Sequence, residues 1–166
     1  MSLEHHDFRG TDVSVQLGPC DDSDIGLVVK AQSFPINVSS QSATGGIHND
    51  SGFEISIREA ANAQNIRHWP NVSIQNPDRR KIVYQAVIDA LEHAEQANVS
   101  SVGFFTLGLE VSRVPSWEVA EEIVKAVYDH VKSGTTLDRI LLVASSPIQV
   151  SSFQFALSNI KIIRDG

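Results

Sequence analysis

Two adjacent glycines, Gly45 and Gly46, begin the stretch of the sequence whose residue types most favour contact with a ligand. The stretch reads GGIHNDSGFEISIREAAN over residues 45–62, and its later part has the spacing of a helix, predicted over 51–63. Glycine lets a ligand approach the backbone closely, and the N-terminus of a helix favours an anionic group such as a phosphate. The pattern therefore predicts a ligand loop, with a simple turn before a helix as the alternative.

The same stretch contains side chains that could move a proton. The imidazole of His48 would suit a general base at neutral pH, and Asp50 or Glu54 could take the same role. These three are the candidate catalytic residues, and a solvent-exposed side chain is the alternative for His48 and Glu54. Two further histidines, His93 and His130, are expected on the solvent side of helices.

The overall composition restricts the class of protein. The chain has 166 residues, of which 42% are hydrophobic and 20% charged, as in a soluble globular domain. Its formal charge of −7 argues against general nucleic-acid binding, which needs clustered Lys and Arg. No apolar run is long enough to span a membrane, and the N-terminal MSLEHHDFRG lacks the apolar core of a secretory signal. We therefore expect no membrane partner and a cytoplasmic or otherwise intracellular location.

The single cysteine, Cys20, gives neither a disulfide framework nor a multi-cysteine metal site. An inert thiol in a turn is favoured over a nucleophile because no base is adjacent to it. His5 and His6 lie in residues 1–11, which are expected to be a flexible N-terminal tail, so their proximity is attributed to chance. We expect no bound metal and no cofactor.

Residues 12–166 are expected to form a single domain in which strands and helices alternate. Apolar runs predict strands, at 12–17, 25–30, 71–75, 101–107, 139–145 and, in the closing IKIIR, 160–164. Helical spacing predicts helices, at 51–63, 77–97, 116–132 and from Pro147 to Ser158. Long loops are expected at 31–50 and 106–115.

Helix signals are strongest in the second half of the chain, where Asn76 and Ser116 are the expected N-caps. The alternation that begins at Asn76 is typical of a mainly parallel sheet with helices on both faces. Ligands of such sheets bind at the carboxyl ends of the strands, where the Gly45–Gly46 loop and the 106–115 loop are expected to meet. The expected core includes Val83, Leu91, Ile123, Val127, Leu141 and Val143.

Three segments together resemble the macro domain, the ADP-ribose-binding α/β/α module. The stretch AVIDALEHAEQANVSSVGFFTLGLEVSRVPSWEVAEEIVKAVYDHV is similar to the family's helix, serine-led strand, glycine loop, proline and helix. LDRILLVASSPIQVSSFQFAL resembles its last long strand and the helix that follows, and GPCDDSDIGLVVKAQS resembles its Gly-Asp turn and second strand. The resemblance implies a three-layer α/β/α macro-like domain with a central mixed, mainly parallel sheet.

The resemblance also implies positions for the ligand-binding residues. The family's aspartate, which receives the adenine amino group, falls at Pro19, and its two asparagines fall at Lys30 and Ser33. Its first glycine loop matches Gly45, Gly46 and Ile47. Because proline has no side-chain acceptor and serine is shorter than asparagine, these replacements weaken the implied adenine and ribose contacts.

The family's diphosphate loop matches Gly108, Leu109 and Glu110. A carboxylate at the third position would repel a diphosphate by about 1 to 4 kcal/mol at roughly 4 Å. Trp117, at the start of the following helix, is a candidate for stacking on a base, with packing as the alternative.

These residues together predict a divergent binding module of the macro-domain type, with a weakened or lost ADP-ribose site. Its expected partner is a nucleotide or ADP-ribose-like ligand, or a protein bound at the same edge. One alternative is a hydrolase of ADP-ribosyl or phosphate esters. Another is a structural or assembly domain whose pocket is no longer used.

Overall fold

The computed structural model describes residues 4–31, 34–38, 53–57, 61 and 63–165. The strands are β1 (Glu4–Phe8), β2 (Thr11–Leu17), β3 (Leu27–Lys30), β4 (Phe34–Val38), β5 (Phe53–Ile57), β6 (Asn65–His68), β7 (Ser101–Phe105) and β8 (Arg139–Ala144). The helices are α1 (Arg79–Gln96), the short α2 (Leu107–Val111), α3 (Ser116–Lys132) and α4 (Pro147–Asp165). No helix in these ranges is long and apolar enough to cross a membrane.

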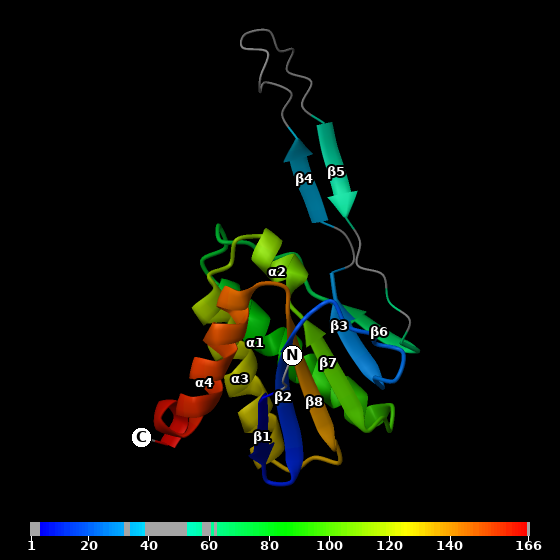
Figure 1. Ribbon diagram of the computed structural model, residues 1–166, viewed down its shortest axis with the longest axis vertical. Coiled ribbons are helices and arrows are strands. Elements are labelled where there is room, and N and C mark those ends of the chain that lie inside the picture. Colours follow the sequence, from blue (N-terminus) through cyan, green and yellow to red (C-terminus); the bar gives the residue numbers. More distant parts are fainter. Residues whose placement is uncertain (1–3, 32–33, 39–52, 58–60, 62, 166) are drawn as a thin grey trace, which may run out of the picture.

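Six strands form the central sheet in the order β1-β2-β8-β7-β3-β6. In this sheet the pairs β2–β8, β8–β7, β7–β3 and β3–β6 are parallel. The outermost strand, β1, pairs antiparallel with β2. All five parallel strands therefore end at the same edge of the sheet. The strands β4 and β5 form a separate antiparallel pair, which extends beyond that edge (Figure 1).

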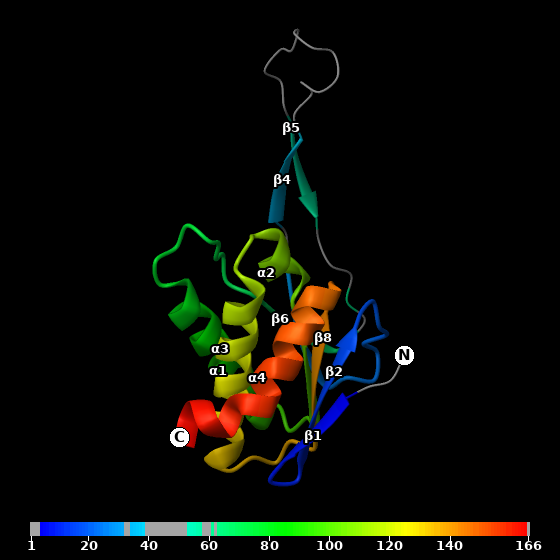
Figure 2. The same cartoon turned by 60° about the vertical axis from the view of Figure 1, so that its left-hand side comes forward.

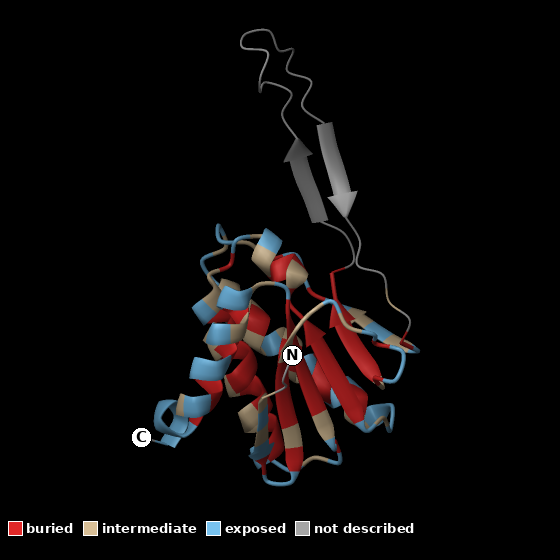
Figure 3. Cartoon of the chain, in the orientation of Figure 1, coloured by how far each residue is buried: buried red, intermediate tan, exposed pale blue. Residues whose placement is uncertain are grey.

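The three long helices pack side by side on one face of the sheet, with α3 between α1 and α4 (Figure 2). Alternation along β8 shows how the two faces are divided. Ile140 and Leu142 belong to the core cluster shared with the helices, whereas Leu141 and Val143 belong to a cluster on the opposite face with Phe105. Figure 3 shows that the strands in the middle of the sheet are buried along almost their whole length.

The sequence-based fold class is confirmed: the protein has a mixed, mainly parallel sheet with flanking helices. The segments 25–30, 101–107 and 139–145 contain the interior strands β3, β7 and β8, and helix 116–132 has the predicted bounds. All six predicted core residues are buried, at 7% exposure or less. In the described part of the chain, the helical layer lies on one face, and non-helical segments around Ile25 and Ala63 pack against the other.

Several local predictions were wrong, each because a competing pattern was present. Phe53–Ile57 is a strand within the predicted helix 51–63, since its apolar and polar residues also alternate with a period of two. The closing residues 160–164 continue α4, because buried Ile160 extends the stripe of Ala156 and Leu157 and no Gly or Pro interrupts the helix.

The connections around α1 also differ from the prediction. The strand before α1 is Asn65–His68 and not 71–75, where the Asn76 side chain instead accepts a hydrogen bond from the Ser73 amide and forms a turn. The helix begins at Arg79, so Asn76 is not its N-cap. The loop predicted over 106–115 contains α2.

The N-terminal segment, expected to be a flexible tail, contributes the edge strand β1. A tight connection at Arg9 and Gly10, both with positive φ, turns β1 back onto β2. The side chain of Phe8 then packs into the core, edge-to-face against Tyr128 at 5.6 Å between ring centroids.

Candidate functional site

The carboxyl edge of the sheet contains a cavity of about 240 Å³ where β2, β7 and β8 end. Each of these strands contributes the residues that directly follow it. The lining residues are Gly18, Pro19, Phe105, Thr106, Leu107, Val143, Ala144 and Ser145. Most of them are apolar, so the walls would suit a flat, largely apolar group with polar atoms at its rim.

The carboxylate of Glu110 lies beside this cavity and binds two of its lining residues. Its Oε2 accepts hydrogen bonds from the Thr106 hydroxyl (2.6 Å), the Ser145 hydroxyl (2.6 Å) and the Ser145 amide (2.9 Å). The Ser145 amide lies just before the N-terminus of α4, where the helix dipole favours a negative charge. The protein thus places a carboxylate of its own on donors that an anionic ligand could use.

A buried ion pair lies at the end of the neighbouring strand β3. Lys30 Nζ is 3.1 Å from Asp22 Oδ2, and both side chains are almost completely buried. The same ammonium group lies 4.2 Å from the centre of the Phe105 ring, which lines the cavity. The position that the resemblance gives to an asparagine therefore holds a cation that is paired inside the protein.

The thiol of Cys20 also belongs to this region. Burial raises the pKa of Cys20, and the nearby Asp22 adds to this effect, whereas Lys30 opposes it. A raised pKa leaves little thiolate near neutral pH. The environment of Cys20 therefore does not resemble that of an activated nucleophile.

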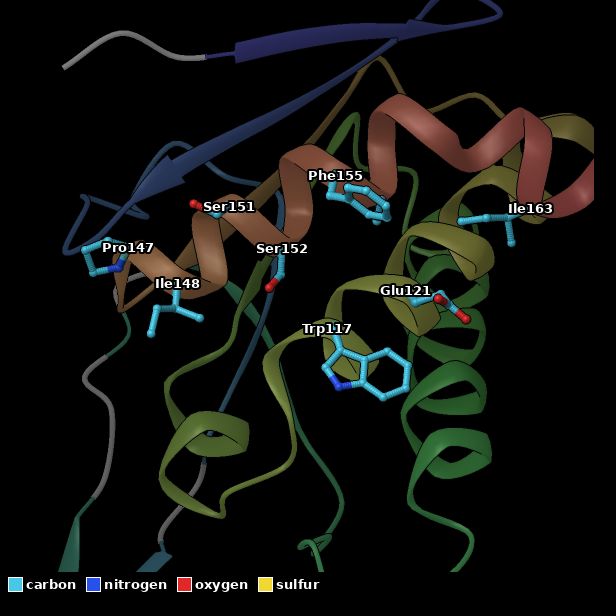
Figure 4. A pocket seen from close by; sticks show the side chains of 9 residues that line it. Trp117, Glu121, Pro147, Ile148, Ser151, Ser152, Phe155 and Ile163 are labelled. Carbon is cyan, nitrogen blue, oxygen red and sulfur yellow. The ribbon is translucent and has the colours of Figure 1, made fainter.

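The structure does not bring all the predicted ligand-binding residues together. Gly108 and Leu109 are buried in α2 and Glu110 lies next to the cavity, but Trp117 lines a different hollow, between α3 and α4 (Figure 4). The other predicted positions lie outside the residues whose side chains are described: Ser33, Gly45, Gly46, Ile47, His48, Asp50 and Glu54. The ligand-loop and general-base predictions at these positions remain predictions.

The second tryptophan, Trp69, is a core residue. Its indole N–H donates a hydrogen bond of 2.8 Å to the Phe105 carbonyl, and its ring packs at 6.0 Å from that of Phe104. Within the described ranges, no group of three or more His, Cys, Asp or Glu side chains is placed to hold a metal ion.

Sequence reasoning did not identify Thr106 and Ser145 as partners of Glu110. Thr106 stands four residues before Glu110, which is the spacing of neighbours on a helix. The sequence around Glu110 could therefore have predicted this contact. Ser145 is 35 residues away, and only the parallel pairing of β7 with β8 brings the two ends together.

Comparison with solved structures relates this fold to macrodomains. The Oceanobacillus iheyensis macrodomain with ADP is similar with a TM-score of 0.68 and 13% identity, and the match covers 98% of each chain. The Trypanosoma brucei macrodomain in complex with ADP-ribose is similar with a TM-score of 0.58 and 14% identity, over 87% of this chain and 68% of that one. The chain therefore has the macrodomain fold.

The similarity lies in the structure and is weak in the sequence. No protein-family model matches the chain, and no curated protein sequence is significantly similar to it. At identities of 13 and 14% the likeness establishes the fold, so the function must be argued from the site.

Proposed function

We propose that this protein is a binding module for a nucleotide or ADP-ribose-like ligand, with reduced affinity for the diphosphate part of such a ligand. The observation that carries the proposal is the cavity at the ends of β2, β7 and β8, together with the Glu110 carboxylate hydrogen-bonded beside it. The macrodomain fold supports this choice of ligand, since solved structures that share it were obtained with ADP and with ADP-ribose.

The size and walls of the cavity suit the base of such a ligand. Pockets for complete small ligands measure about 300 to 1,000 Å³. At about 240 Å³ this cavity matches a part of a nucleotide. Pro19, Phe105 and Val143 provide apolar surface for a planar ring. Pro19 is also the residue that the resemblance aligns with the adenine-contacting aspartate, so we assign the base to this cavity.

The weakness for a diphosphate follows from Glu110. A diphosphate that approached Ser145 would have to displace the carboxylate from the Ser145 amide and hydroxyl, or remain close to its negative charge. Coulomb repulsion in a partly desolvated cleft amounts to about 1 to 4 kcal/mol at roughly 4 Å. Neutral nucleosides would not meet this cost, so the protein is expected to favour them relative to their diphosphates.

Calorimetric titration of adenosine, AMP, ADP and ADP-ribose tests this proposal. We expect wild-type protein to bind adenosine at least as well as ADP. In Glu110→Gln, the amide keeps the size of the side chain and removes the charge, so ADP and ADP-ribose should bind about tenfold more tightly while adenosine is unchanged. Glu92→Gln, which removes the same charge from an exposed position on α1, is the matched control and should have no effect.

Two outcomes would contradict the proposal. If neither wild-type protein nor Glu110→Gln bound any of the four compounds, the cavity would not be a nucleotide site. If wild-type protein bound ADP-ribose with low-micromolar affinity and Glu110→Gln left that affinity unchanged, Glu110 would not weaken the site.

A further inference from the structure

The outer face of α4 differs from the surface of an ordinary solvated helix. No charged residue occurs between Pro147 and Ile160 in a chain whose net charge is −7. The inner face of the helix is buried through Phe153, Ala156, Leu157 and Ile160. The outer face of a helix packed in this way is normally polar and charged, yet here it exposes large apolar side chains.

These side chains form a regular stripe. Ile148, Phe155 and Ile162 are exposed by 69, 70 and 69%, and they are spaced by seven residues. Seven residues make almost two turns, so the three side chains lie on one side of the helix about 10.5 Å apart. A row of large exposed apolar side chains along one face of a helix is a feature that can mark a protein interface.

A hollow of about 430 Å³ borders the stripe on the side of α3. Figure 4 shows Ile148 and Phe155 projecting from α4 and Trp117 from the start of α3. Trp117 is 57% exposed, and its ring is covered on one side by the Arg80 guanidinium, 5.1 Å from the ring centre. The charged residue of the hollow, Glu121, is ion-paired with Arg80 at 2.5 Å. An apolar side chain could therefore enter without meeting an unpaired charge.

We propose that this α4 face, formed by Trp117, Ile148, Phe155, Ile162 and Ile163, binds a second copy of the same chain. The stripe is symmetric about Phe155, because Ile148 and Ile162 stand seven residues before and after it. If two α4 helices pack antiparallel across a two-fold axis at Phe155, Ile148 of each copy meets Ile162 of the other. Self-complementarity of this kind is what a two-fold dimer interface requires.

The available area agrees with a dimer of ordinary size. From the exposed fractions of its two aromatic and three isoleucine side chains, the α4 face offers on the order of 400 Å² of apolar surface per chain. A stable interface buries about 800 Å² per partner, and non-polar atoms make up about 57% of it, which is about 450 Å². The lack of charge on the stripe also lets two chains of charge −7 approach without local repulsion.

Light scattering coupled to size-exclusion chromatography tests the association. Wild-type protein at tens of micromolar should show twice the mass of one chain. Phe155→Glu should show the mass of one chain, because a carboxylate would be desolvated at the two-fold axis. Ile74→Glu, which adds the same charge at another exposed apolar position, should remain dimeric. A monomeric wild-type protein, or a Phe155→Glu variant that is still dimeric, would overturn the proposal.

The antiparallel register can be tested separately by cross-linking. In a Cys20→Ser background, Ile148→Cys and Ile162→Cys chains are mixed and treated with a short bismaleimide. The mixture should give cross-linked dimers that contain one chain of each kind, and each variant alone should give far fewer. Efficient cross-linking of Ile148→Cys with itself would contradict the antiparallel arrangement about Phe155.

Discussion

The sheet has a glutamate-centred hydrogen-bond network at each of its two edges, the edge where the parallel strands begin and the edge where they end. At the amino edge, Glu95 at the end of α1 accepts hydrogen bonds from the hydroxyls of Thr135 and Thr136 and from the Thr136 amide, and it pairs with His130 Nε2 at 2.7 Å. At the carboxyl edge, Glu110 accepts hydrogen bonds from Thr106 and Ser145. Each carboxylate therefore links its own helix to residues from other parts of the chain.

The networks differ in what lies next to them. The partners of Glu95 belong to α3 and to the segment that leads into β8, so its hydrogen bonds stabilise the connections between elements. The partners of Glu110 line the cavity at the end of the sheet. The hydrogen bonds of Glu95 at the amino edge therefore have a structural effect only. Those of Glu110 at the carboxyl edge also occupy donors that an anionic ligand would need. This difference motivates three measurements, taken from the largest expected effect to the smallest.

The largest effect is expected for the carboxylate that is paired with a buried cation at the carboxyl edge. Lys30→Met would leave the Asp22 carboxylate buried without its ammonium partner, 3.1 Å away in the wild-type protein. Removal of one partner of a buried pair costs about 3 kcal/mol of unfolding free energy. Urea unfolding measures this loss. It should exceed that of any single substitution in the Glu95 or Glu110 network.

The double variant Lys30→Met, Asp22→Asn is the control, because it removes both charges. It should recover part of the lost stability, and the recovery identifies the loss of the cation beside the carboxylate as the cause. A loss of less than about 1 kcal/mol in Lys30→Met would contradict the prediction, because it would mean that the Lys30–Asp22 pair contributes little to stability.

An intermediate and pH-dependent effect is expected at the amino edge. Burial raises the pKa of Glu95, but the hydrogen bonds from Thr135, Thr136 and His130 outweigh it and lower the pKa from 4.5 to about 2. A carboxylate whose pKa is lower in the folded state stabilises that state above its unfolded pKa. The contribution is then lost as the pH falls through the folded pKa. The stability from Glu95 should thus be complete above pH 4.5 and decline between 4.5 and about 2.

Glu95→Gln should lower the unfolding free energy by about 2 kcal/mol at pH 7, because a neutral amide accepts these hydrogen bonds less strongly. The difference between the variant and the wild-type protein should shrink as the pH is lowered below 4.5. Urea unfolding of both proteins at a series of pH values measures it. A difference that stays constant down to pH 3 would show that the charge of Glu95 is not the stabilising feature.

The core of the fold could be predicted from the sequence because it depends on local periodicity. The stripe of Ile123 and Val127 and the apolar run at Leu141 and Val143 each identify an element and its buried side without reference to distant residues. Parallel pairing then follows from the alternation of helices and strands. These features determine which strands are interior and that they end at the same edge, and for this reason both were predicted correctly.

The parts that were not predicted depend on contacts between distant segments. His130 was expected on the solvent side of α3, but α3 is the middle helix of its layer and is packed on two flanks. His130 is therefore buried against Glu95 of α1. Glu118 is buried for the same reason and pairs with Arg79 at 2.7 Å. A single helix pattern contains no information on how many neighbours the helix has.

The smallest effect is expected for the direct coupling between Glu110 and Ser145. The hydroxyl of Ser145 donates a 2.6 Å hydrogen bond to the carboxylate, but Ser145 is exposed, so water competes for both groups. A double-mutant cycle with Glu110→Gln and Ser145→Ala should give a coupling energy of about 1 kcal/mol in urea unfolding.

This cycle also separates two explanations of weak diphosphate binding. Ser145→Ala removes the hydroxyl but leaves the charge of Glu110 and the Ser145 amide in place. If Glu110 weakens binding mainly by its charge, Ser145→Ala should leave the affinity for ADP unchanged while Glu110→Gln raises it. If the carboxylate weakens binding by occupying donors, Ser145→Ala should reduce the gain that Glu110→Gln produces, because the hydroxyl that the neutral amide holds less strongly would then be missing. A coupling energy near zero would mean that the charge of Glu110 does not strengthen its contact with Ser145, and the similarity to the Glu95 network would then fail.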